Sequence, residues 1–245
     1  MHPEPPRRGY FITLEGPDGS GKSTQARLLA ERLTAAGVPC LAVREPGGTA
    51  LGEAVRQILL HARDLNPVPA ADALLFNAAR AQHVAEVIRP ALERGDLVVC
   101  DRFADSTIAY QGYGAGQPLD QLRALQIFSI GDLEPDLTLL IDLPVQDGLS
   151  RKSGEEITRF EERRDVAFHR RVRDGFLALA AAEPDRFRVI DGTATIEEVT
   201  DALFEAAAVR LGVEIVAPGG TGTRFGQGKP AQSSEPQGGS LRMDR

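Results

Sequence analysis

A glycine-rich segment near the start of the chain carries the clearest chemical signal. Residues 16–23 read Gly-Pro-Asp-Gly-Ser-Gly-Lys-Ser and match G-x-x-x-x-G-K-[ST] at every fixed position. The apolar run Tyr10-Phe11-Ile12-Thr13-Leu14 precedes the segment, and a helical pattern follows it. Glycines let the backbone curl so that N–H groups point at an anion, and a helix N-terminus adds partial positive charge. The segment therefore predicts a site for a nucleoside triphosphate.

Two side chains that close this segment have distinct expected roles. Lys22 can reach the β- and γ-phosphates, and the Ser23 hydroxyl can ligate Mg²⁺. A chance match is disfavoured, because strand, loop, Lys-Ser pair and helix all agree. The residues expected around the triphosphate are Gly16, Pro17, Asp18, Gly19, Ser20, Gly21, Lys22, Ser23 and Thr24.

A second candidate site closes the apolar strand Leu97–Cys100. Asp101 follows this strand and can hold Mg²⁺ or its waters, and the adjacent Arg102 can form bidentate contacts with a phosphate. A surface Asp–Arg pair is the alternative interpretation. The phosphate-binding loop favours the functional one.

Further polar and aromatic residues form three groups. Arg44 ends a predicted strand and begins the segment Arg-Glu-Pro-Gly-Gly-Thr. On a predicted helix, Phe76, Arg80 and His83 fall at i, i+4 and i+7, so that Phe76 can stack on a base and Arg80 can donate to its carbonyl. A core phenylalanine and a solvated arginine are the alternative there. The third group follows Arg102 and contains Ser106, Thr107, Tyr110, Gln111 and Gly112.

Composition limits the class of protein. The 245 residues, 42% of them hydrophobic, suffice for one α/β core. No apolar run approaches membrane-spanning length and no long apolar segment typical of a secretory signal begins the chain, so we expect a soluble cytoplasmic protein. A net charge of -7 disfavours broad nucleic-acid binding. Cys40 and Cys100 are expected to be reduced core thiols.

Strand and helix patterns alternate along the chain, which predicts a mainly parallel five-stranded sheet with helices on both faces. Ligands then gather at the carboxyl ends of the strands. We expect a flexible N-terminus over 1–8, one domain over 9–213 and a disordered, Gly/Pro/Ser/Gln-rich tail over 214–245. The predicted strands are Tyr10–Glu15, Pro39–Arg44, Leu97–Cys100, Leu137–Ile141 and Arg188–Ile190, and the predicted helices are Lys22–Ala36, Thr49–Leu60, a long segment ending before Gly95, Leu119–Ile130, Glu162–Ala182 and Ile196–Leu211.

Taken in this order over roughly Tyr10–Leu211, the motifs resemble bacterial thymidylate kinases, which have a three-layer P-loop kinase fold with a short lid. The resemblance implies transfer of the γ-phosphoryl of ATP to dTMP with Mg²⁺, in a homodimer. It implies that Asp18 contacts the sugar 3′-hydroxyl or the water shell of the metal, and that Arg102 clamps the acceptor phosphate with Asp101 near the metal. It also implies base contacts for Phe76, Arg80 and Thr107, a 2′-position contact for Tyr110 and a weaker phosphate role for Arg44.

The resemblance places the lid at about Leu149–Glu162. Because residues 17–20 carry no positive charge, the family pattern implies a catalytic arginine supplied by the lid, whose cations are Arg151, Lys152 and Arg159. We assign Arg151 to adenine or phosphate contact and Arg159 to ordering the closed lid. Thr158 stands where such lids often carry an acid, which leaves the catalytic lid residue open.

Two other classes of function remain open at this point. The first is a P-loop kinase for another nucleoside or nucleoside monophosphate. The second is a nucleotide-binding module, either a switch or an inactive paralogue. The guanine-reading Asn-Lys-x-Asp pattern is absent, because neither Asn66 nor Asn77 is followed by Lys.

Overall fold

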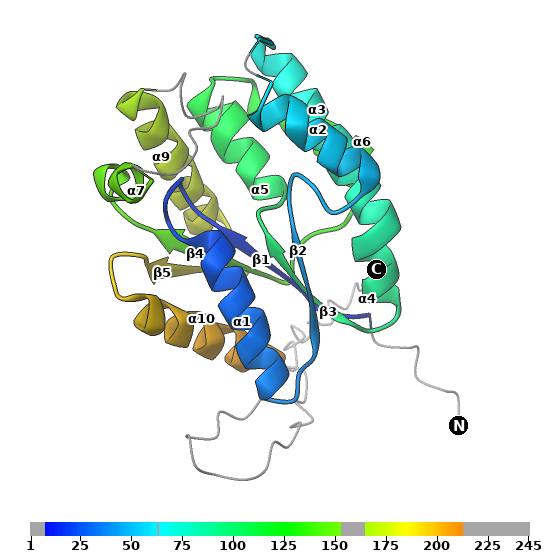
Figure 1. The fold of residues 1–245 in the computed structure, drawn as a ribbon, viewed down its shortest axis with the longest axis vertical. Helices are drawn as coiled ribbons and strands as arrows, with labels where there is room; N and C mark the ends of the chain where they lie inside the picture. Colours follow the sequence, from blue (N-terminus) through cyan, green and yellow to red (C-terminus); the bar gives the residue numbers. More distant parts are fainter. Residues whose placement is uncertain (1–7, 63, 153–164, 213–245) are drawn as a thin grey trace, which may run out of the picture.

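The computed structural model describes residues 8–62, 64–152 and 165–212. At its centre lies a five-stranded parallel sheet with strand order β2-β3-β1-β4-β5, which confirms the predicted α/β class (Figure 1). The strands are β1 (Phe11–Glu15), β2 (Cys40–Arg44), β3 (Leu97–Asp101), β4 (Leu137–Asp142) and β5 (Phe187–Asp191).

Helices connect consecutive strands, as parallel pairing requires. Pro69 begins one of them at a position where its missing N–H costs nothing. The described helices are α1 (Lys22–Ala35), α2 (Ala50–Leu60), α3 (Pro69–His83), α4 (Arg89–Glu93), α5 (Ala104–Thr107), α6 (Leu119–Ile130), α7 (Val145–Arg151), α9 (Val166–Ala182) and α10 (Ile196–Leu211), with π-helical segments η1 (Val84–Ile88) and η2 (Ile108–Gly114).

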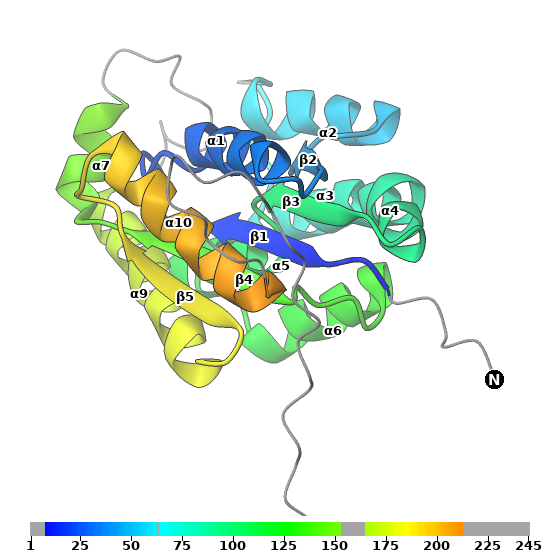
Figure 2. The same ribbon diagram turned by 90° about the horizontal axis from the view of Figure 1, so that it is seen from below.

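The sheet separates two apolar layers. Successive side chains of β1 alternate between its faces, so Ile12 and Leu14 pack against α1 and α10, whereas Phe11 packs on the other side with η1 and α4. A further cluster on that second side joins β4 to η2 and α9. Figure 2 shows the strands between these helical layers. The same alternation turns Thr13 and Glu15 toward the second side, where both side chains are fully buried.

Helix and strand ends differ slightly from the sequence-based expectation. The helix over Ile196–Leu211 is confirmed, because Thr195 and Glu198 form a capping box before it and Gly212 adopts a left-handed conformation after it. Thr49 lies just outside α2 as its N-cap and accepts a hydrogen bond from Gly52 N at 3.0 Å. β3 extends to Asp101, so this acid belongs to the strand.

Three elements were not predicted as such. The polar segment after Arg102, which is not among the predicted helices, forms α5 and η2. α7 covers the first three residues of the predicted lid. Residues 1–7 of the predicted N-terminus 1–8, residues 153–162 of the predicted lid and the predicted tail 214–245 lie outside the described residues. No helix within the described ranges is long and apolar enough to span a bilayer.

The loop between β1 and α1 packs backbone to backbone against α7. A Cβ atom on Gly19 would lie 1.9 Å from Gly148 O, and one on Gly148 would lie 2.4 Å from Asp18 O. Real Cβ atoms do not approach backbone this closely, and Gly19 also has a φ of 76°, which other residues rarely adopt. The contact therefore requires glycine on both sides and fixes the position of the loop.

The substitution Gly148→Ala tests this contact. The added methyl group must push the 16–21 loop away from α7, while Ala suits the helical backbone of α7. We expect ATP affinity to fall about tenfold or more, as misplaced contacts in preorganised sites do, measured by isothermal titration calorimetry. Gln146→Ala, an exposed position on the same helix, is the matched control and should bind ATP like the wild type. Unchanged affinity in Gly148→Ala would show that the loop adapts freely.

Candidate active site

The predicted phosphate-binding loop spans residues 16–21 between β1 and α1. Lys22 begins α1 and is buried, with its Nζ donating to Pro17 O at 2.7 Å and to Ser20 Oγ at 3.0 Å. The side chain thus curls back over the loop, where it faces the space enclosed by the backbone. Burial, and next the neighbouring Arg102, lower the pKa of Lys22 to about 7.

The carboxyl ends of β1 and β3 lie side by side because Leu14 pairs with Asp101 in parallel register. This pairing brings Ser23 to Asp101, and the Ser23 hydroxyl donates to Asp101 Oδ2 at 2.5 Å. Asp101 Oδ1 is buried and has no hydrogen-bond partner in the described part of the chain. A hydroxyl and an orphaned carboxylate oxygen are hard donors, so this pair fits Mg²⁺, which proteins hold with one or two oxygen ligands and substrate phosphates.

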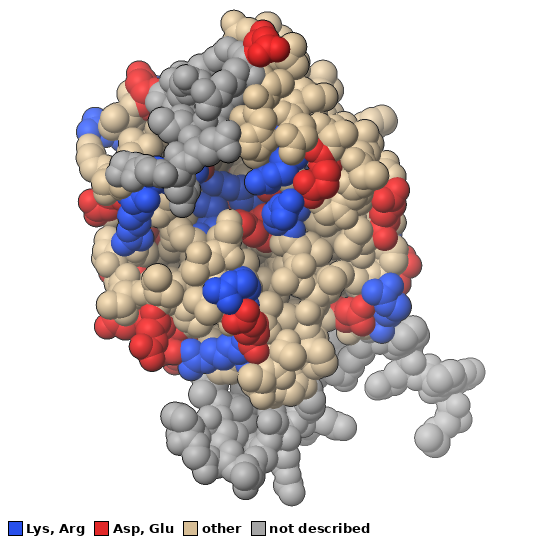
Figure 3. Space-filling model, viewed as in Figure 1, with Lys and Arg blue, Asp and Glu red and all other residues tan. Residues whose placement is uncertain are grey.

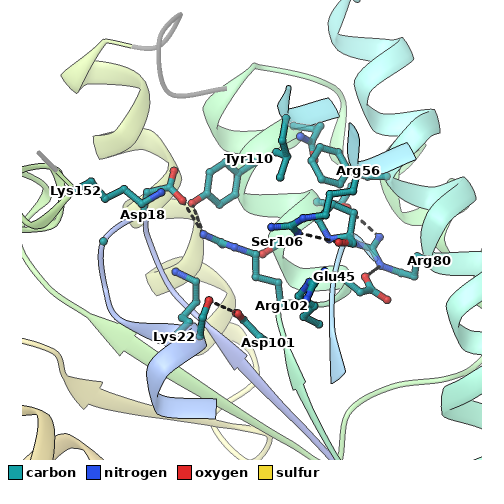
Figure 4. A pocket seen from close by; sticks show the side chains of 18 residues that line it. Asp18, Lys22, Glu45, Arg56, Arg80, Asp101, Arg102, Ser106, Tyr110 and Lys152 are labelled. Carbon is teal, nitrogen blue, oxygen red and sulfur yellow. Dashed lines mark hydrogen bonds and ion pairs between the residues drawn. The ribbon is translucent and has the colours of Figure 1, made fainter. Parts of the chain in front are cut away.

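Arg102 is the central cation of the site (Figure 4). Its Nη2 donates to Asp18 Oδ1 at 2.7 Å and to the Tyr110 hydroxyl at 3.2 Å, and its Nη1 donates to Gly16 O and Ser106 Oγ at 3.2 Å. The guanidinium carbon also lies 5.0 Å from the centre of the Tyr110 ring. The backbone of Arg102 has a φ of 68°, which only tertiary contacts maintain in a residue with a side chain.

Around Arg102 lies a cavity of about 260 Å³, slightly below the range of about 300–1,000 Å³ that small-molecule sites have. Basic side chains surround a hollow on this face of the molecule, as Figure 3 shows. The cavity brings together the phosphate-binding loop, the end of β3, and side chains of α2, α3, α5 and η2. The predicted site residues among its lining are Asp18, Gly19, Lys22, Ser23, Arg44, Phe76, Arg80, Asp101, Arg102, Thr107 and Tyr110.

Arg80 lines the cavity from α3 although its side chain is only 2% exposed. Its Nε donates to Glu45 Oε2 at 2.7 Å, its Nη1 to Thr107 Oγ1 at 2.9 Å, and its Nη2 to Phe103 O at 3.1 Å. Glu45 also lies 3.3 Å from His83 Nδ1. Arg80 is therefore fixed by protein contacts, which rules out the alternative of a solvated charge.

Phe76 lines the same cavity one turn before Arg80 and packs beside the apolar cluster of α2 and α3. Both interpretations of Phe76 therefore hold in part, because its side chain packs against the core and also borders the cavity. His83, the third residue of the predicted face, is fully buried behind Glu45 and does not line the cavity.

The predicted basic residues farther from Arg102 differ in whether they line the cavity. Arg44 lies at the rim with a half-exposed side chain, and its Nη2 donates to both carboxylate oxygens of Glu53 at 3.0 and 3.1 Å. Arg151 ends α7 and donates to Gly192 O at 3.0 Å, so it contacts the turn after β5 and does not line the cavity. Lys152 does line it. Arg159 lies outside the described residues.

Several polar side chains that border the cavity or its centre had no predicted role, Arg56, Gln111 and Glu15 among them. Arg56 on α2 lines it and donates to Pro46 O at 2.9 Å. Gln111 on η2 lines it, and its buried Nε2 has no partner in the described residues. Glu15 is buried behind Arg102. Gln111 belongs to the group of polar and aromatic residues noted after Arg102, but the orientation of its side chain depends on the π-helical geometry of η2. Arg56 carried no signal at all.

The fold and this site define the class of protein: a P-loop kinase whose phosphate-binding loop borders a cavity lined by several cationic side chains. Comparison with known proteins narrows the class. The sequence model of the family "Thymidylate kinase" matches residues 14–203. The thymidylate kinase of Geobacter sp. strain M21 is 51% identical over 209 residues, which cover 82% of this chain and 92% of that protein. That of Thermomicrobium roseum is 52% identical over 197 residues, with coverages of 80% and 92%.

A solved structure gives the same result. The crystal structure of thymidylate kinase from Ehrlichia chaffeensis is 37% identical, with a TM-score of 0.67, and the match covers 82% of this chain and 99% of that one. This chain belongs to the thymidylate kinase family.

Asp18 gives a prediction for stability against acid. Burial alone would raise its pKa, but Arg102 and then Lys22 hold it down to about 2. Because the pKa in the folded state lies below that of the unfolded chain, ionised Asp18 stabilises the fold above about pH 5. This contribution, on the order of 2 kcal/mol, is lost as the pH falls from about 4 towards 2.

The variant Asp18→Asn should therefore be less stable than the wild type at pH 7, and the difference in unfolding free energy should shrink below pH 4. Urea denaturation of both proteins without nucleotide, at a series of pH values, measures this. A difference that stays constant down to pH 2 would contradict the ion pair as the cause.

Proposed function

We propose that this protein transfers the γ-phosphoryl group of ATP to dTMP, giving dTDP and ADP. The observation that carries the proposal is the position of Arg102. Its guanidinium lies between the phosphate-binding loop, through Asp18 and Gly16, and the cavity bordered by Tyr110, Thr107 and Phe76. A cation at that point can hold the phosphate of a nucleotide whose base occupies the cavity, directly facing the phosphate of ATP.

The donor side follows from the loop. Backbone amides of residues 16–21, together with Lys22 and the first turn of α1 with Thr24, would bind the triphosphate. Ser23 and Asp101 would hold Mg²⁺, which neutralises charge on the phosphates during transfer. The loop carries no basic side chain between Gly16 and Gly21, so cations for the transferring group must come from elsewhere.

The acceptor phosphate would be held by Arg102, with Arg56, Arg44 and Lys152 around the same cavity. Its oxygens are already ionised near neutral pH, so the reaction needs no general base. What the site must supply is close positioning of two polyanions and compensation of charge on the transferring group. Asp18, which Arg102 holds in place, would accept a hydrogen bond from the 3′-hydroxyl of the sugar. Tyr110 would fill the space at the 2′ position and so exclude the 2′-hydroxyl of ribonucleotides.

The base would be recognised by stacking and hydrogen bonds. Phe76 offers a ring, and the Arg80 guanidinium has five N–H bonds but four contacts from the described residues, which leaves one for a base carbonyl. Gln111 offers one donor and one acceptor, which match a ring carbonyl and the neighbouring N–H of thymine. Thr107 accepts from Arg80, so its own proton is available to a base acceptor.

The lid residues complete the proposal. Arg151, held at Gly192, would contact the adenine of ATP near the turn after β5, and Lys152 would reach the phosphates across the cavity. A cation that arrives on closure contributes most in the transition state and excludes water, which would otherwise accept the phosphoryl group. The role assigned to Arg159 stays a prediction.

An acceptor panel tests the function. ADP production from Mg-ATP should depend strongly on dTMP and weakly or not at all on UMP, dCMP, dGMP or AMP. Arg102→Ala should lower kcat/KM for dTMP at least 100-fold, the size expected for losing a preorganised cation, while the fold is retained. Preference for another monophosphate would overturn the base-reading roles. ATP binding without any acceptor-dependent turnover would favour an inactive paralogue.

We also infer a cytoplasmic homodimer. The two cysteines are free thiols, as proteins of reducing compartments have. On the side of the molecule formed by α2, α3 and α6, Phe128 is 89% exposed, Ile127 68% and Leu74 57% (Figure 1). Large apolar side chains on adjoining helices are typical of a surface that a partner covers, and a second copy of the chain is the partner implied by the family.

The substitution Phe128→Asp should weaken self-association by about 30-fold or more, because it removes a large apolar group and adds a buried charge. Sedimentation velocity over a concentration series measures the effect. Val209→Asp, at a 74% exposed position on α10, is the matched control and should sediment like the wild type. A wild type that stays monomeric throughout the series would refute the dimer.

A further inference from the structure

Glu15 is a buried ionisable residue that the proposed function does not use. It ends β1, immediately before the phosphate-binding loop, and its side chain is fully buried. Removing a carboxylate from water is unfavourable unless partners compensate for the lost hydration. An apolar residue would fill the position without this cost, so the partners of Glu15 indicate what the carboxylate does.

Those partners all belong to the segment that follows Arg102. Glu15 Oε1 accepts from Phe103 N at 2.7 Å and from Ser106 N at 3.3 Å, and Oε2 accepts from Ser106 Oγ at 2.6 Å. Leu14 O accepts from Arg102 N at 3.0 Å. The end of β1 thus holds the peptide groups on both sides of the Arg102 Cα atom, where the backbone has its left-handed φ of 68°.

The side chains form a second connection between the same residues. Arg102 Nη1 donates to Ser106 Oγ at 3.2 Å, and Ser106 Oγ donates onward to Glu15 Oε2. Arg102 has only donors and an ionised carboxylate only acceptors, so the serine hydroxyl must accept from the first and donate to the second. This chain of hydrogen bonds has one polarity while Glu15 is ionised. Figure 4 shows Ser106 beside the Arg102 side chain.

The groups around Glu15 act on its carboxyl in opposite directions. Burial, and next the nearby Asp105, raise the pKa of Glu15 to about 7, although Arg102 and the hydrogen bonds from Ser106 and Phe103 lower it. Asp105 is itself paired with Arg186, at 2.7 and 3.0 Å. The charge of Glu15 therefore depends on its contacts with the Arg102–Ser106 segment.

We propose that Glu15 is a positioning residue for the acceptor phosphate: it orients the Arg102 guanidinium, through Ser106 and through the backbone of Phe103. This inference rests on the proposed role of Arg102. It predicts that loss of the Glu15 charge harms the use of dTMP much more than the binding of ATP, although Glu15 is adjacent to the loop that binds ATP.

The test compares Glu15→Gln, Ser106→Ala and the double variant. Glutamine keeps the size and the acceptor for Phe103 N, but it presents a donor or an uncharged oxygen to Ser106. We expect kcat/KM for dTMP to fall about 10- to 100-fold in Glu15→Gln, as for a misplaced catalytic group, with KM for dTMP raised at least fivefold. KM for ATP and the affinity for ATP should stay within twofold. Because both residues act in one chain, the double variant should lose little more than the worse single variant.

Thr13→Val is the matched control. Thr13 points to the same side of β1, is fully buried, and its hydroxyl lies 3.0 Å from that of Thr138. This variant should lose stability without changing the ratio of the dTMP and ATP kinetic constants. If Glu15→Gln fails to fold, Ser106→Ala and Ser106→Thr still decide: the alanine variant should show the dTMP-specific loss, and threonine, which keeps the hydroxyl, should restore most of it.

Three results would overturn the inference: a folded Glu15→Gln with kcat/KM for dTMP within twofold of wild type, additive losses in the double variant, or an equal loss of ATP affinity. The wild-type protein distinguishes failure of this inference from failure of the proposed function. If the unmodified protein shows no dTMP-dependent turnover, the proposed function itself is refuted.

Discussion

Parallel pairing of β1 with β3 is the constraint on which the site depends. The register sets Leu14 opposite Asp101, so the loop that leaves β1 and the Asp-Arg pair that ends β3 reach the same edge of the sheet. Without that pairing, Ser23 and Asp101 would not share a hydrogen bond, and Arg102 would not reach Gly16 O or Asp18. Residues about 80 positions apart in the chain become neighbours through a short stretch of backbone hydrogen bonds, and the helices on both faces keep those strands dry.

The second principle of the site is the balance of charge in a small volume. Lys22 is buried and Arg102 partly buried at the edge of the sheet, and each has acids close by, Asp18 and Asp101 among them. Arg80 is balanced by Glu45 in the same way. Asp18 holds Arg102 and Glu45 holds Arg80 in fixed orientations before any polyanion arrives, and a site organised in advance does not have to reorder during the reaction. Where nucleotide phosphates bind, they would take over part of the role of the carboxylates.

Much of this arrangement could be predicted from the sequence. The loop, the apolar strands and the motifs at strand ends follow local rules, so the five strands and the motifs at their carboxyl ends were predicted correctly. Phe76 and Arg80 of the predicted helix face do line the cavity, whereas His83 of the same face does not. What failed depended on tertiary structure. α5 and η2 lack a sustained helical pattern, and contacts with β1, α6 and α9 stabilise them. Arg56 and Gln111 line the cavity because of the direction in which their side chains point, which the spacing of residues in the sequence does not reveal. Glu15 appeared only as the last residue of a predicted strand. The predicted adenine contact of Arg151 stays a prediction, beside its bond to Gly192.

The close approach of Gly19 to Gly148 has an evolutionary consequence. Two segments that lie more than a hundred residues apart share one backbone contact with no room for a side chain on either partner. Neither position can therefore drift independently of the other. A relative that carries a larger residue at one of them must have moved α7 or reshaped the loop, and such a relative would mark a subgroup in which the donor nucleotide lies differently against the protein.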